Sequence, residues 1–588
     1  MSTTIITSLT TDQVAALSTR TLAALNTEDW SVFTSEQVSA LNSRQIAAIT
    51  TDGLAALTTE ALAGLETSDL VGLSTRQMRA LTTDQVAALS SDQLSNLSSQ
   101  QIRAFTTAQV QALETGDLAA LTTRQAAALT TEQAHALTSD QVAALETDDL
   151  RAMTTQAIRA LTTDAIAALT SEQAAALSMA QLAAFTTAQL VALATDDLAA
   201  MSSAQTAALS TALMAVLTTS QVAALTTEQF AGLNTRQIQS LNTEQVRALV
   251  TDQVAALTTA QSVALNSTQV QALTTEQVQA FETADLRALN TRSLQAMTTA
   301  GIEALSTEQA AALSTRQVAA LTSAQVEAVA TDDLAVLSTA QVRALGTTLL
   351  DALTTAQVAA LQTEQMAGLS TAQVRALDTA QVQALSTSNI EALESTQVRA
   401  LSSTQAGALT TEQVQAIETA DLRAMTSIAV AALGTSAVVA LTTDQAAALT
   451  TGQVAAMTTA QVAAIATDDL ESLTTAQVAA LLTQQVQALQ TDQVQALTSD
   501  QVAGLSTRQV SALTTAQVAV VETTDVVALT TRQAAALNSA QVAALTTDQV
   551  QALETSDLRA IRSTAISALT TAGVDVLTTE QVSALFIA

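Results

Sequence analysis

The sequence contains no cysteine, no proline and no tyrosine, and it has one histidine (His135), one tryptophan (Trp30) and six phenylalanines. A chain without cysteine has no disulfide, no thiol nucleophile and no thiolate ligand for zinc. One histidine provides neither a metal cluster nor a nucleophile and base pair. We therefore expect no enzyme activity, no catalytic residue and no cofactor.

Positive charge is also scarce, because all 21 basic residues are arginines and 53 residues are acidic, which gives a formal net charge of −32. Phosphate backbones and anionic lipid surfaces repel such a chain. Although 48% of the residues are hydrophobic, Thr, Ser or Gln interrupts every apolar stretch well before the roughly 18 residues that a membrane span requires. We expect neither nucleic-acid binding nor membrane insertion.

What the sequence does contain is an eight-residue repeat that starts at Leu9 and continues without insertion or deletion to Ala584, for 72 octads. The first four octads read LTTDQVAA, LSTRTLAA, LNTEDWSV and FTSEQVSA. Position 1 is apolar, position 5 is usually Gln with Asp as its common replacement, and position 6 is usually Val, Ile or Leu. Position 3 is Thr or Ser in 71 of the 72 octads, and Met179 is the exception.

A hydroxyl residue followed by acidic or neutral residues and then by an apolar residue is typical of a helix N-cap. We assign this cap to position 3, so that each octad begins a new helix of about six residues. Gln at position 5 is expected to hydrogen-bond turn backbone or a neighbouring Gln along the stack. Trp30 occupies the apolar position 6 and is expected in the core.

Two other arrangements fit the spacing poorly. In one continuous helix the apolar stripe would drift by roughly 80° per octad, and no partner could cover it. A β-solenoid needs inward residues of one parity, whereas the apolar positions 1, 6 and 8 mix parities. Short helices survive in water only when neighbours cover them.

The predicted fold is therefore all-α, a solenoid of very short capped helices with one helix per octad. Residues 1–8 form a lead-in, residues 9–584 the continuous solenoid, and residues 585–588 an apolar C-terminal tail. The spacing leaves open whether two or three octads make one coil.

A second period of 17 octads overlies the first. It relates the acidic octads that contain Glu146, Glu282, Glu418 and Glu554. Duplication of a 17-octad block explains this recurrence, and a superhelical repeat that returns one face to the same side is the alternative. In the first of these octads Glu146, Asp148 and Asp149 place three carboxylates within one turn, which makes them candidate Ca²⁺ ligands. They lack the loop spacing of known calcium motifs, and acids at helix N-termini are favourable without a metal.

Octads such as LTTDQVAA and LSTRQVAA resemble tracts in large bacterial surface and adhesion proteins that are often labelled as haem-utilisation or adhesion proteins. The resemblance covers nearly the whole chain and implies a structural or adhesive role at a cell surface. A haem role does not follow, because the chain offers a single histidine.

The last residues, Leu585-Phe586-Ile587-Ala588, resemble the apolar tails of bacterial type I secretion substrates, which are typically acidic and free of cysteine. The first residues lack the basic region and the long apolar region of a cleaved secretory signal. These features imply an extracellular or cell-surface location, reached without a cleaved N-terminal signal.

Terminal repeats of a soluble solenoid usually differ from the interior ones, but here the first octads look like the rest and the C-terminus adds apolar residues. We expect head-to-tail contacts between copies of the chain, which generate open filaments. Ile5 and Ile6 of one copy would dock against Leu585, Phe586 and Ile587 of the next. The first alternative is a monomeric adhesin or spacer stalk, and the second is an ice-binding or Ca²⁺-dependent surface protein.

Overall fold

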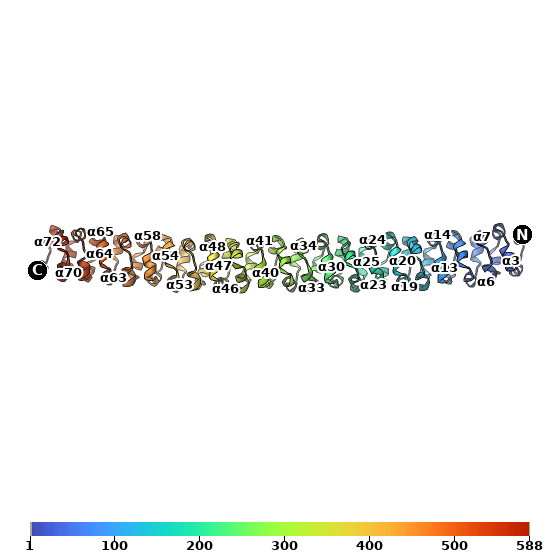
Figure 1. Ribbon diagram of the computed structural model, residues 1–588, viewed down its shortest axis with the longest axis horizontal. Helices are drawn as coiled ribbons and strands as arrows, with labels where there is room; N and C mark the ends of the chain where they lie inside the picture. Colours follow the sequence, from blue (N-terminus) through green and yellow to red (C-terminus); the bar gives the residue numbers. More distant parts are fainter. Residues whose placement is uncertain (1–2, 587–588) are drawn as a thin grey trace. The chain divides into compact units, whose positions relative to one another are not determined.

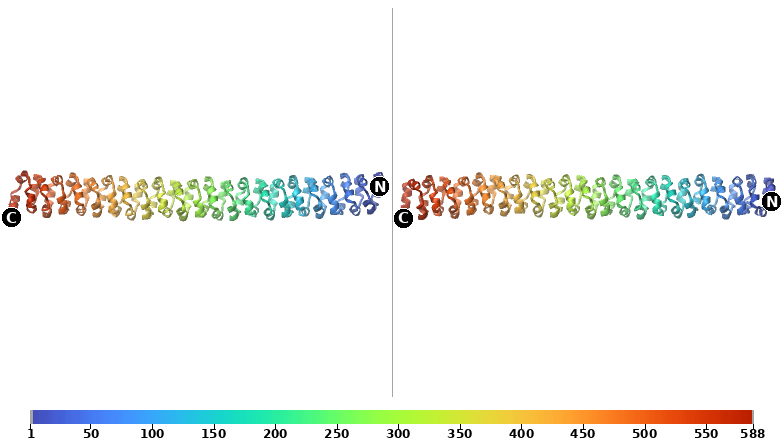
Figure 2. Two further views of the ribbon diagram at one scale, coloured as in Figure 1. Left: turned by 45° about the horizontal axis from the view of Figure 1, so that its top comes forward. Right: turned by 90° about the horizontal axis from the view of Figure 1, so that it is seen from above.

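The computed structural model describes residues 3–586, and within them it contains 73 short helices and no strand. This confirms the predicted all-α solenoid. The chain divides into two compact units, Met1–Met297 and Thr298–Ala588. In each unit the helices follow one another in a regular stack of short coils (Figures 1 and 2).

The helices follow the octads closely. With few exceptions a helix begins at position 3 of its octad and ends at position 6, 7 or 8, as in α4 (Thr27–Trp30), α18 (Ser139–Ala143) and α19 (Thr147–Ala152). One exception is α44 (Gly346–Asp351), which begins at position 2, where Gly346 has a φ of 67°. Residues that carry a side chain rarely adopt this left-handed backbone conformation, so glycine suits this junction.

The octad of α18 shows why the helix starts where it does. Thr138 has an extended backbone, and its hydroxyl accepts a hydrogen bond from the N–H of Gln141 at 3.2 Å. In return, Gln141 Oε1 accepts from the N–H of Thr138 at 3.0 Å. This reciprocal pair is a capping box, which satisfies two backbone donors that the helix leaves unpaired.

The N-cap is therefore position 2, and our assignment of the cap to position 3 was wrong by one residue. Position 3 is the first residue inside the helix, and its hydroxyl can make contacts elsewhere. Position 2 tolerates variation because position 5 does half of the capping: at Val250, which has no acceptor, Gln253 Oε1 still accepts from the Val250 N–H at 3.1 Å.

Three octads make one coil, because each helix packs against the third helix before it and the third after it. Gln at position 5 joins one coil to the next. In α18, Gln141 Nε2 donates to the carbonyls of Leu113 at 2.7 Å and Val110 at 2.9 Å, which lie 28 and 31 residues earlier. We call this contact the glutamine bridge. It confirms the expected contact of Gln with turn backbone, since the partners are carbonyls of the preceding coil.

Positions 1 and 6 fill the core, as the sequence predicts. Val142 and Leu145 are buried, and so is Trp30, whose ring stacks on that of Phe33 with the centroids 4.7 Å apart. Trp30 also explains the glycine at position 5 of a neighbouring coil, because a Cβ on Gly53 would lie 2.5 Å from Trp30 Cδ1. A larger core residue thus excludes the glutamine bridge at this octad.

Helices also occur at both ends of the described chain. The predicted lead-in, residues 1–8, contains α1 (Thr3–Ile6), which lies where the octad pattern would place a helix and contacts α4. At the other end, α73 (Thr579–Phe586) extends into the predicted tail, and Ile587 lies outside the described residues. Among the described helices none is long and apolar enough to cross a membrane.

The first prediction concerns the glutamine bridge. Gln141→Glu replaces a donating amide with a carboxylate that faces two carbonyls, so we expect a local loss of about 2–4 kcal/mol from two lost hydrogen bonds and an unsatisfied buried group. Hydrogen exchange of the α18 amides, followed by mass spectrometry at pH 7, measures this loss. Asp140→Asn, at the exposed neighbouring position, is the matched control. Unchanged protection of α18 in Gln141→Glu would show that the bridge does not stabilise the coil.

Candidate functional surfaces

The acidic octad that suggested a calcium site does not bring its carboxylates together. Asp149 lies at position 5 of its octad and is 4% exposed, whereas Glu146 and Asp148 are on the surface. Residues 3–586 contain no group of three acidic or histidine side chains that could hold a metal ion. The burial of Asp149 explains this, because position 5 faces the preceding coil.

Burial raises the pKa of Asp149 to about 6, and the negative charges of Glu146 and Asp148 act in the same direction. Other aspartates at position 5 share this environment. Burial also raises the pKa of Asp117, Asp197, Asp285, Asp333, Asp469, Asp525 and Asp557. In each of them, burial favours the protonated form of the carboxyl.

The hydroxyl at position 3 donates a hydrogen bond to several of these aspartates. Ser171 donates to Asp197 Oδ1 at 2.8 Å, and Ser499 donates to Asp525 Oδ1 at 2.7 Å. In each pair the serine lies 26 residues before the aspartate, in the preceding coil. The sequence did not predict this contact, because the position 3 hydroxyl was assigned to the N-cap of its own helix. The regular spacing of serine and aspartate could have revealed it once a coil of three octads was known.

The second prediction uses the raised pKa of Asp149. Because its folded pKa of about 6 exceeds the ordinary value of 3.8, its contribution to stability is present below pH 4 and is lost as the pH rises through 6. Asp149→Asn should remove this dependence and add a donor. Asn389, which stands at position 5 of its own octad, donates through Nδ2 to the Leu361 carbonyl at 2.8 Å.

Exchange protection of α19 at pH 5 and pH 7.5, corrected for intrinsic rates, measures the effect. We expect protection to fall with rising pH in the wild type and to stay level in Asp149→Asn. Asp148→Asn, at an exposed position, should keep most of the dependence. The same fall in Asp149→Asn as in the wild type would rule out Asp149 as its source.

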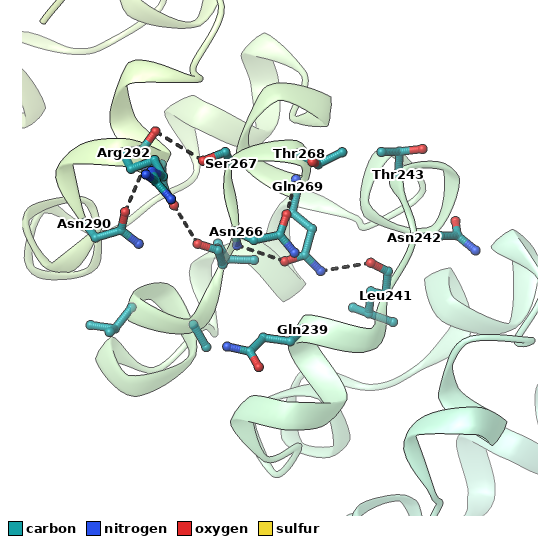
Figure 3. Close-up of a pocket in the computed structure, with 14 residues that line it drawn as sticks. Gln239, Leu241, Asn242, Thr243, Asn266, Ser267, Thr268, Gln269, Asn290 and Arg292 are labelled. Carbon is teal, nitrogen blue, oxygen red and sulfur yellow. Dashed lines mark hydrogen bonds between the residues drawn. The ribbon is translucent and has the colours of Figure 1, made fainter.

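The first unit carries an open polar groove of about 820 Å³ on its surface (Figure 3). Asn242, Asn266 and Asn290 line it, each at position 2 of every third octad and thus one per coil. Each caps its own helix, since its Oδ1 accepts from the N–H three residues later at 2.9–3.0 Å. Arg292 adds a positive charge to the lining. The groove combines amides and hydroxyls, which can hydrogen-bond a polar molecule.

The single histidine lies apart from this groove. His135 is exposed, and its Nδ1 lies 3.0 Å from the carbonyl of Ala160 in the next coil.

The residues predicted for a polymer interface lie in different environments. Ile5 is half exposed, but Ile6 is fully buried, so Ile6 belongs to the core of its own chain and the prediction that it docks is wrong. Leu585 is partly exposed, and Phe586 ends α73. Ile587 falls outside the described residues.

The last coil exposes apolar residues that sequence reasoning missed. Val574 and Val582, both at position 6, are 52% and 39% exposed, whereas Val542 and Val550 at the same position one coil or more earlier are buried. Every octad has the same pattern, so the sequence shows no sign of this exposure. It arises because no later coil covers these residues within the described chain.

The first coil exposes a polar group instead. Gln13 Oε1 accepts from the Thr10 N–H at 2.9 Å, as in a capping box. The register of the glutamine bridge would place the partners of its Nε2 before residue 1, and the Gln13 side chain is exposed.

Comparison with known proteins gives one family. The family described as the ALTTAQ repeat matches most of the chain, at residues 22–59, 62–99, 110–147, 142–179, 190–227, 222–259, 278–315, 326–363, 358–395, 390–416, 414–451, 462–499, 518–555 and 550–586. The six letters of that description stand in this sequence at Ala352–Gln357, which correspond to position 8 of one octad and positions 1 to 5 of the next. No curated protein matches the chain.

Proposed function

We propose that this chain, which belongs to the ALTTAQ repeat family, is a structural protein whose copies stack head to tail into a filament. The proposal is supported by the polarity of the contact between coils. In the glutamine bridge the amide points toward the preceding coil, and the carbonyls that it binds belong to that coil. Two copies can therefore continue the same contact in one direction only.

The apolar surface of the last coil is the observation that carries this proposal. Inside the chain a following coil covers the position 6 side chains, and burying one valine or leucine stabilises by about 1.5–3 kcal/mol. In the last coil Val574 and Val582 are left to solvent. Solenoids that remain monomeric usually cover such an end with polar capping repeats.

The first coil complements the last one. Gln13 supplies an amide donor, and the half-exposed Ile5 adds apolar surface in the same coil. The carbonyls of Leu569 and Leu577, at position 1, stand where glutamines of a following coil would bind. A second copy placed there would extend the internal register, and heterologous contacts of this kind lead to open filaments.

The second candidate is a monomeric spacer or adhesin stalk. The net charge of −32 favours it, because strong like charge keeps separate chains apart. An extracellular or cell-surface location, expected from the resemblance to bacterial surface proteins, is part of both proposals.

The third prediction separates the two candidates. Val574→Lys places a charge on the end of the last coil, so we expect assembly to require roughly 10 times more protein or more, from the lost burial of one valine. Light scattering over a concentration series, with electron microscopy of the same samples, measures the change. Val439→Lys is the matched control, because Val439 is 55% exposed but lies in the interior of the chain.

The filament predicts that the mass of the wild type grows with concentration, that Val574→Lys suppresses this growth and that Val439→Lys does not. A wild type that keeps one mass over the whole series would instead establish the monomeric stalk.

The fourth prediction tests the other end. Gln13→Glu keeps the size of the side chain but removes the donor, so we expect weaker assembly by about 3–10-fold, as for the loss of one hydrogen bond. Asp12→Asn, at the exposed neighbouring residue, serves as the control in the same scattering series. Assembly of Gln13→Glu at the wild-type concentration would exclude Gln13 from the contact between copies.

A further inference from the structure

The period of 17 octads marks places where the glutamine bridge is missing. At four places, each 17 octads after the last, three consecutive octads, the number that makes one coil, lack Gln at position 5. The residues found there are Asp149, Ala157 and Ala165; Asp285, Ser293 and Gly301; Asp421, Ala429 and Ala437; and Asp557, Ala565 and Gly573. We call these four sets the unbridged coils. A further set outside this period, near the start of the chain, consists of Gly53, Ala61 and Asp69.

The first unbridged coil lacks the hydrogen bonds that its neighbours make. Just after it, Gln173 Nε2 donates to Leu145 O at 2.7 Å and to Val142 O at 2.9 Å. In the unbridged coil the corresponding acceptors are the carbonyls of Leu121, Leu129 and Leu137. Within the part of the chain that the structure describes, no side chain donates to these three carbonyls.

The residues that replace glutamine cannot make the bridge. Ala157 and Ala165 are fully buried and have no polar group. The buried aspartates accept hydrogen bonds, as Asp421 does from Ser395 of the preceding coil, but an ionised carboxylate has nothing to donate. Ser293 keeps part of the contact, by donating to the Leu265 carbonyl at 2.8 Å.

The same octads lose the capping box, because position 5 supplies half of it. A hydroxyl cap alone remains in some of them, as at Thr154, whose Oγ1 accepts from the Ala157 N–H at 3.1 Å. In α19 and α53 (Thr419–Ala424) the N-cap is glutamate, and neither helix has a side-chain hydrogen bond at its cap. The helix α55 (Thr435–Val439) begins after Gly434 and also lacks one. Weak capping and missing bridges thus coincide in one coil.

We propose that the unbridged coils are built-in joints at which the solenoid opens locally, and that they divide it, once every 17 octads, into blocks that stay folded while a joint opens. In a solenoid each repeat contacts only its neighbours, so stability is a sum of local terms. The coil with the fewest hydrogen bonds to its neighbour opens first. Apolar burial does not distinguish the joints, because Leu150, Ile158 and Ile166 are as buried as their counterparts elsewhere.

Hydrogen exchange of the full chain at pH 7, followed by mass spectrometry, tests the joints. Peptides from residues 146–168 and 418–440 report two joints, and peptides from 170–192 and 442–464 report the bridged coils that follow them. After correction for intrinsic rates, we expect the joints to exchange at least about tenfold faster, as the loss of several hydrogen bonds implies. Equal protection of the joints and the bridged coils would overturn the proposal.

Two variants change the joints in opposite directions. Combining Asp149→Gln, Ala157→Gln and Ala165→Gln introduces three bridges and should slow exchange at 146–168 to the level of 170–192. Combining Gln173→Ala, Gln181→Ala and Gln189→Ala removes three bridges and should create a new fast segment at 170–192.

The first variant fails to fold if the helices around Ala157 lie too close together to accommodate glutamine. The second variant then still tests the proposal. Slow exchange at 170–192 after removal of all three bridges would also overturn the proposal. Both measurements are made on dilute, unassembled chain, so their outcome is independent of filament formation.

Discussion

The structure depends on one side chain with two ends, the glutamine at position 5. Its oxygen accepts from the N–H of the N-cap of its own helix, and its amide donates to two carbonyls of the preceding coil, as Gln141 shows with Thr138, Val110 and Leu113. Helices of about one turn are not stable alone in water. The same residue that starts each helix therefore also attaches it to the neighbour that stabilises it.

A buried amide is costly unless its hydrogen bonds are made. Here the cost is offset at each bridged octad, because the acceptors are carbonyls at the C-terminal end of a short helix. Val110 O, for example, accepts one backbone N–H, that of Leu113, and has a lone pair left for the amide of Gln141. Position 5 consequently accepts few substitutes. Asp reverses the direction of the contact and accepts from a hydroxyl of the preceding coil, as in Asp197 with Ser171. Small residues omit the contact, and Gly53 does so because Trp30 occupies the space.

The proposed assembly depends on the surfaces of the coils. Along the chain the outer positions carry Thr, Ser, Asp, Glu and Arg, which keep the sides hydrated and mostly negative. Within the described chain the first and last coils differ, because the contact that an interior coil makes on both sides is there made on one side. The proposed assembly and the proposed joints both follow from the directional glutamine bridge. The assembly would continue the bridge beyond the first and last coils, and the joints are the coils in which the bridge is missing.

The octad pattern alone established the period, the helical character and the solenoid, because a hydroxyl, Gln and Val at fixed spacing within eight residues encode a capped helix with one apolar face. It placed Trp30 and the leucines of position 1 in the core for the same reason. It placed the N-cap one residue too late, because positions 2 and 3 both carry hydroxyls and only the backbone distinguishes the extended residue, such as Thr138, from the first helical one. Similarly, it grouped Glu146, Asp148 and Asp149 as possible ligands, although one of the three faces inward.

The number of octads per coil, the partners of the glutamines and the exposure of Val574 and Val582 came from the tertiary fold. Near-identical octads do not reveal which of them are neighbours in space, since the contacts between one coil and the next arise from the three-dimensional stacking of helices. The recurrence at 17 octads is visible in the sequence, but its meaning depends on knowing what Gln141 binds, because a missing bridge is recognised only after the bridge itself is known.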